Sequence, residues 1–144
     1  MAVATISFFS EDTSFRIREV KSLRAWLSLC AAKEQKQIDT LSIVFCSDEY
    51  LLEVNQNYLK HDTFTDIITF DYSELPHISG DLFISIDRVR ENAKRYKVSA
   101  KEELHRVIIH GVLHLCGYKD KNDRDQQIMR KKEDDCLSLR ASIF

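Results

Sequence analysis

The chain has 144 residues, of which 44% are hydrophobic and 31% charged. This length and composition are typical of a globular protein, so residues 1–144 are interpreted as a single domain. The formal net charge of −2 argues against bulk electrostatic binding of nucleic acid, so phosphate binding would need a local basic patch. The sequence has no apolar run of membrane-spanning length and no basic segment before an apolar core, which predicts a cytoplasmic location and no membrane partner.

The N-terminal part of the chain predicts two strands that alternate with two helices. Residues 2–10 and 40–46 are rich in β-branched and aromatic side chains, as strands are. Apolar residues recur at helical spacing between them and predict an amphipathic helix over residues 21–34. Ser47 offers an N-cap for a second helix over residues 48–59. The buried face of this second helix is expected to consist of Leu51, Val54 or Asn55, and Tyr58.

The middle of the chain predicts two more strands. Residues 60–65 are polar and turn-like, and residues 66–71 have the composition of a strand. Residues 72–79 contain the only proline and predict a loop. The alternating pattern of residues 80–86 then predicts a fourth strand.

Three helices are predicted to follow. Asp87 is interpreted as the cap of a charged helix over residues 88–97. Ser99 and Glu102 have the spacing of a capping box and start a helix over residues 100–116, which is apolar almost all round and is therefore expected to be buried. The last helix, from about residue 123, is expected to carry one stripe of Ile128, Lys132, Cys136 and Leu139. Together these elements predict an α+β fold, with one mixed β-sheet of about four strands and the helices packed against it.

The end of the buried helix carries a motif with metal-binding spacing, HGVLHLCGYKD over residues 110–120. Residues four apart are neighbours on one helical face, so His110 and His114 can hold one metal ion. Gly117 can end the helix and turn the chain back, and Asp120 could then supply a third ligand. Three protein ligands and one open position are the plan of a catalytic zinc site, with one ion per chain. Asp123 is the alternative third ligand.

Other interpretations of the histidines compete with metal binding. Each imidazole could instead be a core side chain that hydrogen-bonds to the backbone. The pair resembles the His-Glu-x-x-His of metalloproteases, but Gly111 stands where the catalytic glutamate would be, which argues against a peptidase. His105 lies about 140° round the helix from His110 and is expected to stay outside the site, whereas His61 and His77 fall in predicted loops.

The four cysteines show no Cys-x-x-Cys spacing, and three lie in apolar patterns. Buried free thiols are therefore predicted for Cys30, Cys46, Cys116 and Cys136, in preference to disulfides or metal ligands.

Two blocks of the sequence resemble the YbeY family of bacterial single-strand-specific endoribonucleases and ribosomal RNA maturation factors. The motif that starts at His110 resembles the family signature His-Gly-x-Leu-His-Leu-x-Gly-Tyr-Asp-His. A second block agrees in order and spacing, with Val54-Asn55, Tyr58, Asp62, Thr65-Asp66-Ile67, Phe70, Gly80-Asp81-Leu82 and Ile84-Ser85. The resemblance covers residues 51–120 and, more loosely, both ends of the chain.

The chain departs from the family pattern at three places. Lys119 and Asp120 stand where the family has Asp-His, so a carboxylate replaces the third histidine. Leu59 stands where the family usually has an arginine, which would hold a phosphate bidentately, and the adjacent Lys60 could substitute only in part. Phe64 replaces a family proline.

The resemblance implies a zinc-dependent hydrolase of RNA phosphodiester bonds. It implies a role in small-subunit ribosomal RNA 3′-end processing and ribosome quality control, with RNA and the small ribosomal subunit as partners and no DNA. Lys60, His61 and Asp62 would lie near the site, and Asp81 could orient a metal ligand or simply make local hydrogen bonds. No general base is assigned.

Contacts with RNA are expected from one helical face. Arg90, Lys94 and Lys97 share that face, although a solvated surface is the simpler interpretation of such a run. Two other functions remain open: a non-catalytic ribosome-assembly factor with a structural zinc, and a zinc peptidase.

Overall fold

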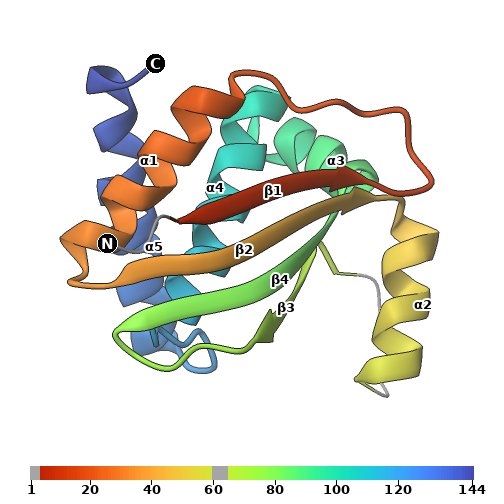
Figure 1. Cartoon of the computed structure of the whole chain (residues 1–144). Helices are drawn as coiled ribbons and strands as arrows, with labels where there is room; N and C mark the ends of the chain where they lie inside the picture. The colour runs from red at the N-terminus through yellow and green to blue at the C-terminus, as the bar shows by residue number, and fades with distance from the viewer. Residues whose placement is uncertain (1–3, 60–64) are drawn as a thin grey trace.

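The computed structural model describes residues 4–59 and 65–144. Within these residues it has four strands and five α-helices, followed by a short 3₁₀-helix. In chain order these are β1 Thr5–Ser10, α1 Val20–Lys33, β2 Gln37–Cys46, α2 Asp48–Tyr58, β3 Ile67–Asp71, β4 His77–Ser85, α3 Ile86–Tyr96, α4 Ala100–Leu115, α5 Asp123–Ser138 and the 3₁₀-helix Leu139–Ser142. The strands form one sheet of order β1-β2-β4-β3 (Figure 1). Because β1, β2 and β4 are parallel and β3 runs antiparallel to β4, the sheet is mixed, and the predicted α+β fold is confirmed.

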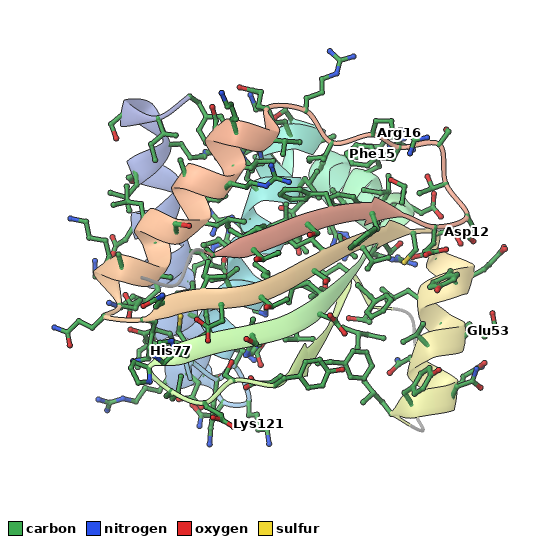
Figure 2. All side chains as sticks on the ribbon, viewed as in Figure 1. Asp12, Phe15, Arg16, Glu53, His77 and Lys121 are labelled. Atoms are coloured by element: carbon green, nitrogen blue, oxygen red, sulfur yellow. The ribbon has the colours of Figure 1, made fainter. Side chains whose placement is uncertain are left out.

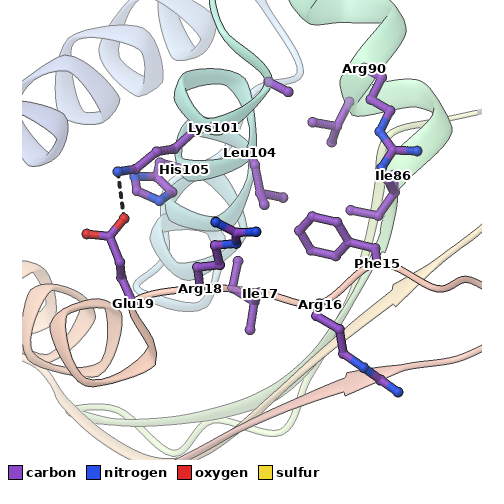
Figure 3. A pocket seen from close by; sticks show the side chains of 12 residues that line it. Phe15, Arg16, Ile17, Arg18, Glu19, Ile86, Arg90, Lys101, Leu104 and His105 are labelled. Carbon is purple, nitrogen blue, oxygen red and sulfur yellow. Dashed lines mark hydrogen bonds and ion pairs between the residues drawn. The ribbon is translucent and has the colours of Figure 1, made fainter.

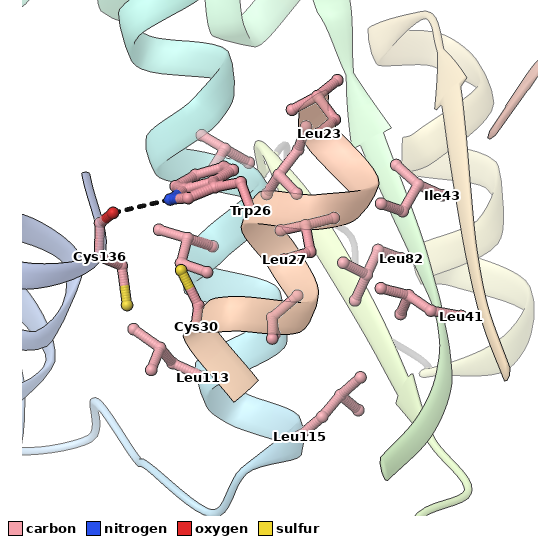
Figure 4. Close-up of a cluster of buried hydrophobic side chains, with 14 of the residues drawn as sticks. Leu23, Trp26, Leu27, Cys30, Leu41, Ile43, Leu82, Leu113, Leu115 and Cys136 are labelled. Carbon is pink, nitrogen blue, oxygen red and sulfur yellow. Dashed lines mark hydrogen bonds between the residues drawn. The ribbon is translucent and has the colours of Figure 1, made fainter. Parts of the chain in front are cut away.

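The two faces of the sheet are covered unequally. Side chains from one face join those of α1, α3, α4 and α5 in the main hydrophobic core. Leu27 of α1 faces Leu41, Ile43 and Leu82 of the sheet, whereas Trp26 points toward Cys136 of α5 (Figure 4). The indole nitrogen of Trp26 donates to the backbone oxygen of Cys136 at 2.7 Å, which ties α1 to α5. A smaller cluster on the other face joins α2 to the sheet.

Helix α4 is the buried helix that the sequence predicts, and its two ends are defined by hydrogen bonds. Ser99 caps its start, because its side-chain oxygen accepts from the Glu102 amide at 3.0 Å. At the other end, the Gly117 amide donates to the His114 carbonyl at 3.0 Å and the Tyr118 amide donates to the Leu113 carbonyl at 3.1 Å. These two bonds make a Schellman motif, which needs a left-handed residue after the cap, and Gly117 has φ +111°. The predicted helix stop is confirmed.

Three of the predicted elements begin at the wrong residue: β2 starts at Gln37 rather than residue 40, and the starts of β4 and α3 also differ. Strand β4 begins at His77, because His77 and Ile78 pair with Gln37 and Ile38 of β2, whereas residues 77–79 were predicted to be a loop. Helix α3 is capped by Ser85, whose side-chain oxygen accepts from the Arg88 amide at 3.1 Å.

Asp87, the predicted cap, is instead the second residue of α3. Its carboxylate accepts from the Asp48 amide at 2.9 Å, so it satisfies the first turn of α2. The cap was misassigned because this bond joins two helix starts that are far apart in the sequence.

Two predicted buried faces are also wrong in part. Helix α2 buries Leu51, Val54 and Asn55, but Tyr58 at its last turn is 71% exposed. On helix α5, Cys136 is buried as predicted, but Met129 and Glu133 are buried in place of Ile128 and Lys132 of the predicted stripe. The buried residues of this helix are Met129, Glu133, Cys136 and Leu137, whereas Ile128 is 40% exposed.

The buried cysteines agree with the prediction: all four are buried free thiols. In the described part of the chain, no helix combines the length and the apolar character needed to cross a membrane.

At Gly80, strand β4 lies close to β3 and to the end of α4. A Cβ atom there would lie 2.5 Å from the Phe70 carbonyl oxygen and 2.9 Å from Leu115 Cδ2. We therefore expect Gly80→Ala to lower the free energy of unfolding by about 2 kcal/mol, because the β3 backbone must move. Urea unfolding measures this, with Ser42→Ala on β2 as the control and a change within about 0.5 kcal/mol expected there. An unchanged free energy of unfolding in Gly80→Ala would show that the β3 backbone accommodates a Cβ atom at residue 80 without strain.

His105 predicts a pH dependence of stability. It is 3% exposed, and the Arg140 guanidinium donates to its Nδ1 at 2.9 Å. Burial, assisted by the charges of Arg140 and Lys101, lowers the pKa of His105 to about 4, although the carboxylates of Glu102 and Glu19 act in the opposite direction.

Because the folded pKa lies below the unfolded value of about 6.5, the unfolded state binds the proton first as the pH falls. We expect the protein to lose up to about 3 kcal/mol of stability between about pH 6.5 and pH 4 from this group. Denaturant titrations across that range should show a smaller loss for His105→Gln. An equal loss in both proteins would exclude His105 as the cause.

Candidate metal centre

The two histidines of the motif lie together on α4, at the edge of the core. The Nε2 atoms of His110 and His114 are 2.9 Å apart, and the side chains are 22% and 27% exposed. The neighbouring Gly111 faces the sheet, where a Cβ would lie 2.8 Å from Ile67 Cδ1 and 2.9 Å from Leu82. Gly111 therefore lets α4 approach β3 and β4 closely, and it leaves the imidazoles on the open side of the helix.

Each imidazole is oriented through its other nitrogen. His114 Nδ1 lies 2.8 Å from the Tyr118 carbonyl oxygen, and His110 Nδ1 lies 2.7 Å from Glu133 Oε2. A carbonyl oxygen can only accept a hydrogen bond, so Nδ1 of His114 carries the proton and its Nε2 has a free lone pair. The Glu133 carboxylate favours the same tautomer in His110. Both Nε2 lone pairs are thus available to one electrophile between the rings.

Asp120 completes the set from the turn after α4. Its Oδ2 lies 3.2 Å from His110 Nε2 and 3.4 Å from His114 Nε2. Two ligand atoms about 2.1 Å from a tetrahedral zinc are about 3.4 Å apart. The three separations of 2.9, 3.2 and 3.4 Å are close enough to this value for one ion to contact all three atoms. Within residues 4–59 and 65–144, His110, His114 and Asp120 form the one cluster of His, Cys, Asp or Glu side chains that could hold a metal ion.

The turn that carries Asp120 is held by contacts from α1 and α5. The Tyr118 hydroxyl donates to Glu34 at the end of α1, and Lys132 of α5 pairs with the same carboxylate at 3.1 Å. The side-chain amide of Gln126 donates from Nε2 to the Asp120 carbonyl oxygen at 3.1 Å. These contacts fix the backbone on both sides of residue 119, so the carboxylate is positioned before any metal binds.

Glu133 links the site to α5 and sets its electrostatics. It is 5% exposed and also accepts from Arg106 at 2.8 Å. Burial raises the pKa of Glu133, but the hydrogen bonds from His110 and Arg106 outweigh it and hold the pKa below the ordinary value. For His110, burial lowers the pKa. The hydrogen bond to Glu133 and the charges of Glu133, Asp120 and Asp66 outweigh burial, so the pKa of His110 is raised overall.

An open groove runs past the three candidate ligands. It is bounded by β3, by the end of α2 at Asn55 and Leu59, and by the turn that carries Lys119 and Lys121. A second cavity between α3, α4 and α5 adjoins it, and both share Asp66, His110 and Asp120. Asp66, predicted only as a strand-entry residue, therefore lies beside the site, and burial raises its pKa.

The remaining predicted residues lie elsewhere. Asp123 begins α5 and is outside the three-residue set. Asp81 accepts from the Tyr72 hydroxyl at 3.3 Å, which is the local role considered for it. His105 is buried away from the site, as predicted, and His77 starts β4 at the surface and pairs with Asp39 at 3.1 Å (Figure 2).

Three of the four predicted RNA-contact residues lie in the described part of the chain. Arg90 and Lys94 are exposed on α3, and Lys97 is exposed at its C-cap. Lys60, His61, Asp62 and Phe64 lie outside the described residues.

Sequence reasoning missed Glu133. It is one of several acids on a charged helix, and it lies 23 residues from His110 in the chain. The available signal was its phase on α5, because Met129, Glu133, Cys136 and Leu137 form one stripe and a lone acid on a buried stripe needs a partner.

The fold and the site together define an α+β protein with a two-histidine, one-carboxylate candidate metal centre at the end of a buried helix. The family model described as endoribonuclease YbeY matches residues 6–140. The chain therefore belongs to the endoribonuclease YbeY family, as its motifs predicted.

Individual relatives agree over nearly the whole length. An endoribonuclease YbeY of Cytophaga hutchinsonii is 53% identical over 141 residues, which cover 97% of this chain and 99% of that protein. One of Flavobacterium psychrophilum is 54% identical over 131 residues, covering 91% and 94%. The solution structure of TM1509 from Thermotoga maritima matches with a TM-score of 0.66 at 25% identity, and covers 94% of this chain and 89% of that one.

Proposed function

We propose that this protein is a zinc-dependent, single-strand-specific endoribonuclease that matures the 3′ end of small-subunit ribosomal RNA and takes part in ribosome quality control in the cytoplasm. The observation that carries the proposal is the convergence of His110, His114 and Asp120 in an open groove. Membership of the endoribonuclease YbeY family and the names of the two relatives support RNA as the substrate. The ribosomal step rests on the family resemblance.

Zinc is proposed because nitrogen and carboxylate ligands at tetrahedral spacing suit it. Bound there, zinc would supply a Lewis acid that polarises a phosphoryl oxygen or lowers the pKa of a water. The ligands are 22%, 27% and 41% exposed, so one side of the site stays open to a substrate, as in catalytic rather than structural zinc sites.

The protein's own side chains would bind and orient the RNA. Lys119 and Lys121 line the groove beside Asp120, where an ammonium group can hold a phosphate as a point charge. Lys119 stands where the family has an aspartate, so this chain gains a cation at the position next to its substituted ligand. Lys60, Arg90, Lys94 and Lys97 are proposed as further RNA contacts.

Parallel cleavage assays test the proposal. We expect the protein to cut an unstructured RNA and a small-subunit ribosomal RNA precursor with a 3′ extension, to spare duplex RNA and casein, and to lose activity in a chelator. Casein hydrolysis without RNA cleavage would contradict the proposal, although Gly111 offers no general base for it. Ribosome association that survives loss of the metal without any RNA cleavage would favour an assembly factor.

A further inference from the structure

A second cavity lies at the other end of α4 from the metal ligands. It has a volume of about 200 Å³, and it is lined by residues 15–19 before α1, by the first turn of α3 and by the first turns of α4. None of its lining residues also lines the metal groove. Leu104 and His114 are ten residues apart on one helix, so the two sites are separated by about 15 Å.

The floor of this cavity is apolar and contains an aromatic ring. Phe15 lies at its centre, with Ile17, Ile86 and Leu104 around it (Figure 3). The ring of Phe15 packs edge-on against Phe45 with the centroids 5.1 Å apart, which fixes its orientation. Because the floor is apolar and the Phe15 ring is held in place, a planar group could enter the cavity and contact that ring.

The rim of the cavity is cationic. Arg18 points toward the ring of Phe15 and Arg90 lies on its other side, whereas Arg16 points away (Figure 3). Glu19 is the acid among the lining residues, and it is paired with Lys101 at 2.6 Å. In the described part of the chain, no carboxylate lies within ion-pairing distance of Arg18 or Arg90. The first turns of α3 and α4 add the positive ends of two helix dipoles.

We propose that this cavity binds one unpaired nucleotide of a single-stranded RNA, with the base against Phe15 and its phosphates held by Arg18 and Arg90. The inference rests on the proposed function only in taking RNA as the ligand. Guanidinium groups match phosphate bidentately, and aromatic rings stack with any base. The site would anchor the strand about 15 Å from the metal centre, along α4.

A continuous basic surface favours RNA over an acidic peptide here. Lys94 follows Arg90 one turn along α3, and Lys97 follows at the C-cap, so cations extend from the rim of the cavity along one helix face. The regularly spaced phosphates of a single-stranded RNA could pair with successive cations of this row. Because the whole chain carries a net charge of −2, a local basic surface of this kind is what phosphate binding requires.

Fluorescence anisotropy with a labelled, unstructured 12-nucleotide RNA tests the cation contacts. We expect Arg18→Gln/Arg90→Gln to bind this RNA at least about 10-fold more weakly. The slope of log affinity against log salt should fall in magnitude by about 1.4, because the variant loses its contacts with two phosphates. The control Lys33→Gln/Lys131→Gln makes the same charge change on exposed residues of α1 and α5 and should keep more of the affinity. Equal losses in the two double variants would reduce the effect to net charge and overturn the proposal.

Binding is measured in a His114→Ala background, and cleavage of the same RNA is followed separately with His114 present. An absence of cleavage alone would then count against the proposed function, and unchanged RNA binding in the Arg18/Arg90 double variant would count against this cavity. If a glutamate-rich peptide with one phenylalanine loses affinity in that variant while RNA does not, the occupant is a protein and the proposal fails.

NMR tests the insertion of the base. Adenosine monophosphate should shift the methyl resonances of Val89 and Leu104 in the full-length protein, and ribose 5-phosphate should shift them much less. Equal shifts with both probes would show that the cavity takes phosphate without the base and would overturn this part of the proposal.

Discussion

Replacing His114 by alanine is expected to remove metal binding and RNA cleavage together. Nε2 of His114 lies 2.9 Å from Nε2 of His110 and 3.4 Å from Asp120 Oδ2, so its loss leaves two ligands for the ion. Removing only an outer partner of a metal ligand costs 10- to 100-fold, and removing a ligand should cost more than about 100-fold in affinity. Isothermal titration with zinc and an RNA cleavage assay measure the two losses.

The fold should survive this change, because the His114 side chain is 27% exposed and its Nδ1 bonds to a backbone oxygen, that of Tyr118, rather than to another buried side chain. Circular dichroism and urea unfolding of the metal-free proteins provide the control. Wild-type zinc affinity in His114→Ala would exclude the site. Normal RNA cleavage by the metal-free variant would exclude the mechanism.

The second large effect is expected at Glu133, which we assign as a positioning residue. Its carboxylate fixes His110 through Nδ1 and is itself held by Arg106. Glutamine keeps the shape but removes the charge, so His110 loses its preference for the tautomer that offers Nε2. We expect Glu133→Gln to weaken zinc binding and RNA cleavage by about 10- to 100-fold.

Asp134 offers a matched control for this variant. It also pairs with Arg106, at 2.7 Å, but it is 58% exposed and does not reach His110. Asp134→Asn should leave zinc affinity unchanged. Equal zinc affinity in Glu133→Gln and Asp134→Asn would show that Glu133 only stabilises the helix packing. A lower thermal stability without a change in zinc affinity would lead to the same conclusion.

The sequence predicted the parts of the site that depend on local geometry. The pair His110–His114 follows from helical spacing, and the helix end at Gly117 follows from the need for a left-handed residue there. Asp120 could be predicted as a third ligand because it lies three residues after that glycine, at the end of the turn. In the structure, one donor atom from each of the three side chains lies within 4.8 Å of the others, so the group could hold a metal ion.

The parts that the sequence missed depend on tertiary packing. Glu133 reaches His110 only because α5 packs along α4, and the phase of α5 was misjudged by one residue because its polar composition hides the buried stripe. Tyr58 has the spacing of a buried residue, but it is 71% exposed and its ring contacts Phe70 only edge-on, with the centroids 6.1 Å apart. The cavity at Phe15 was not predicted because residues 15–19, five of its twelve lining residues, lie in a connection without helical or strand periodicity.

The zinc content of protein purified without a histidine tag tests the central claim most directly. Elemental analysis of the wild-type chain should find close to one zinc per chain, falling well below one in His110→Ala, His114→Ala and Asp120→Ala. Asp120→His, which restores the family's third histidine, should retain the metal. Well under one metal per wild-type chain, or an unchanged content in the three alanine variants, would contradict the account.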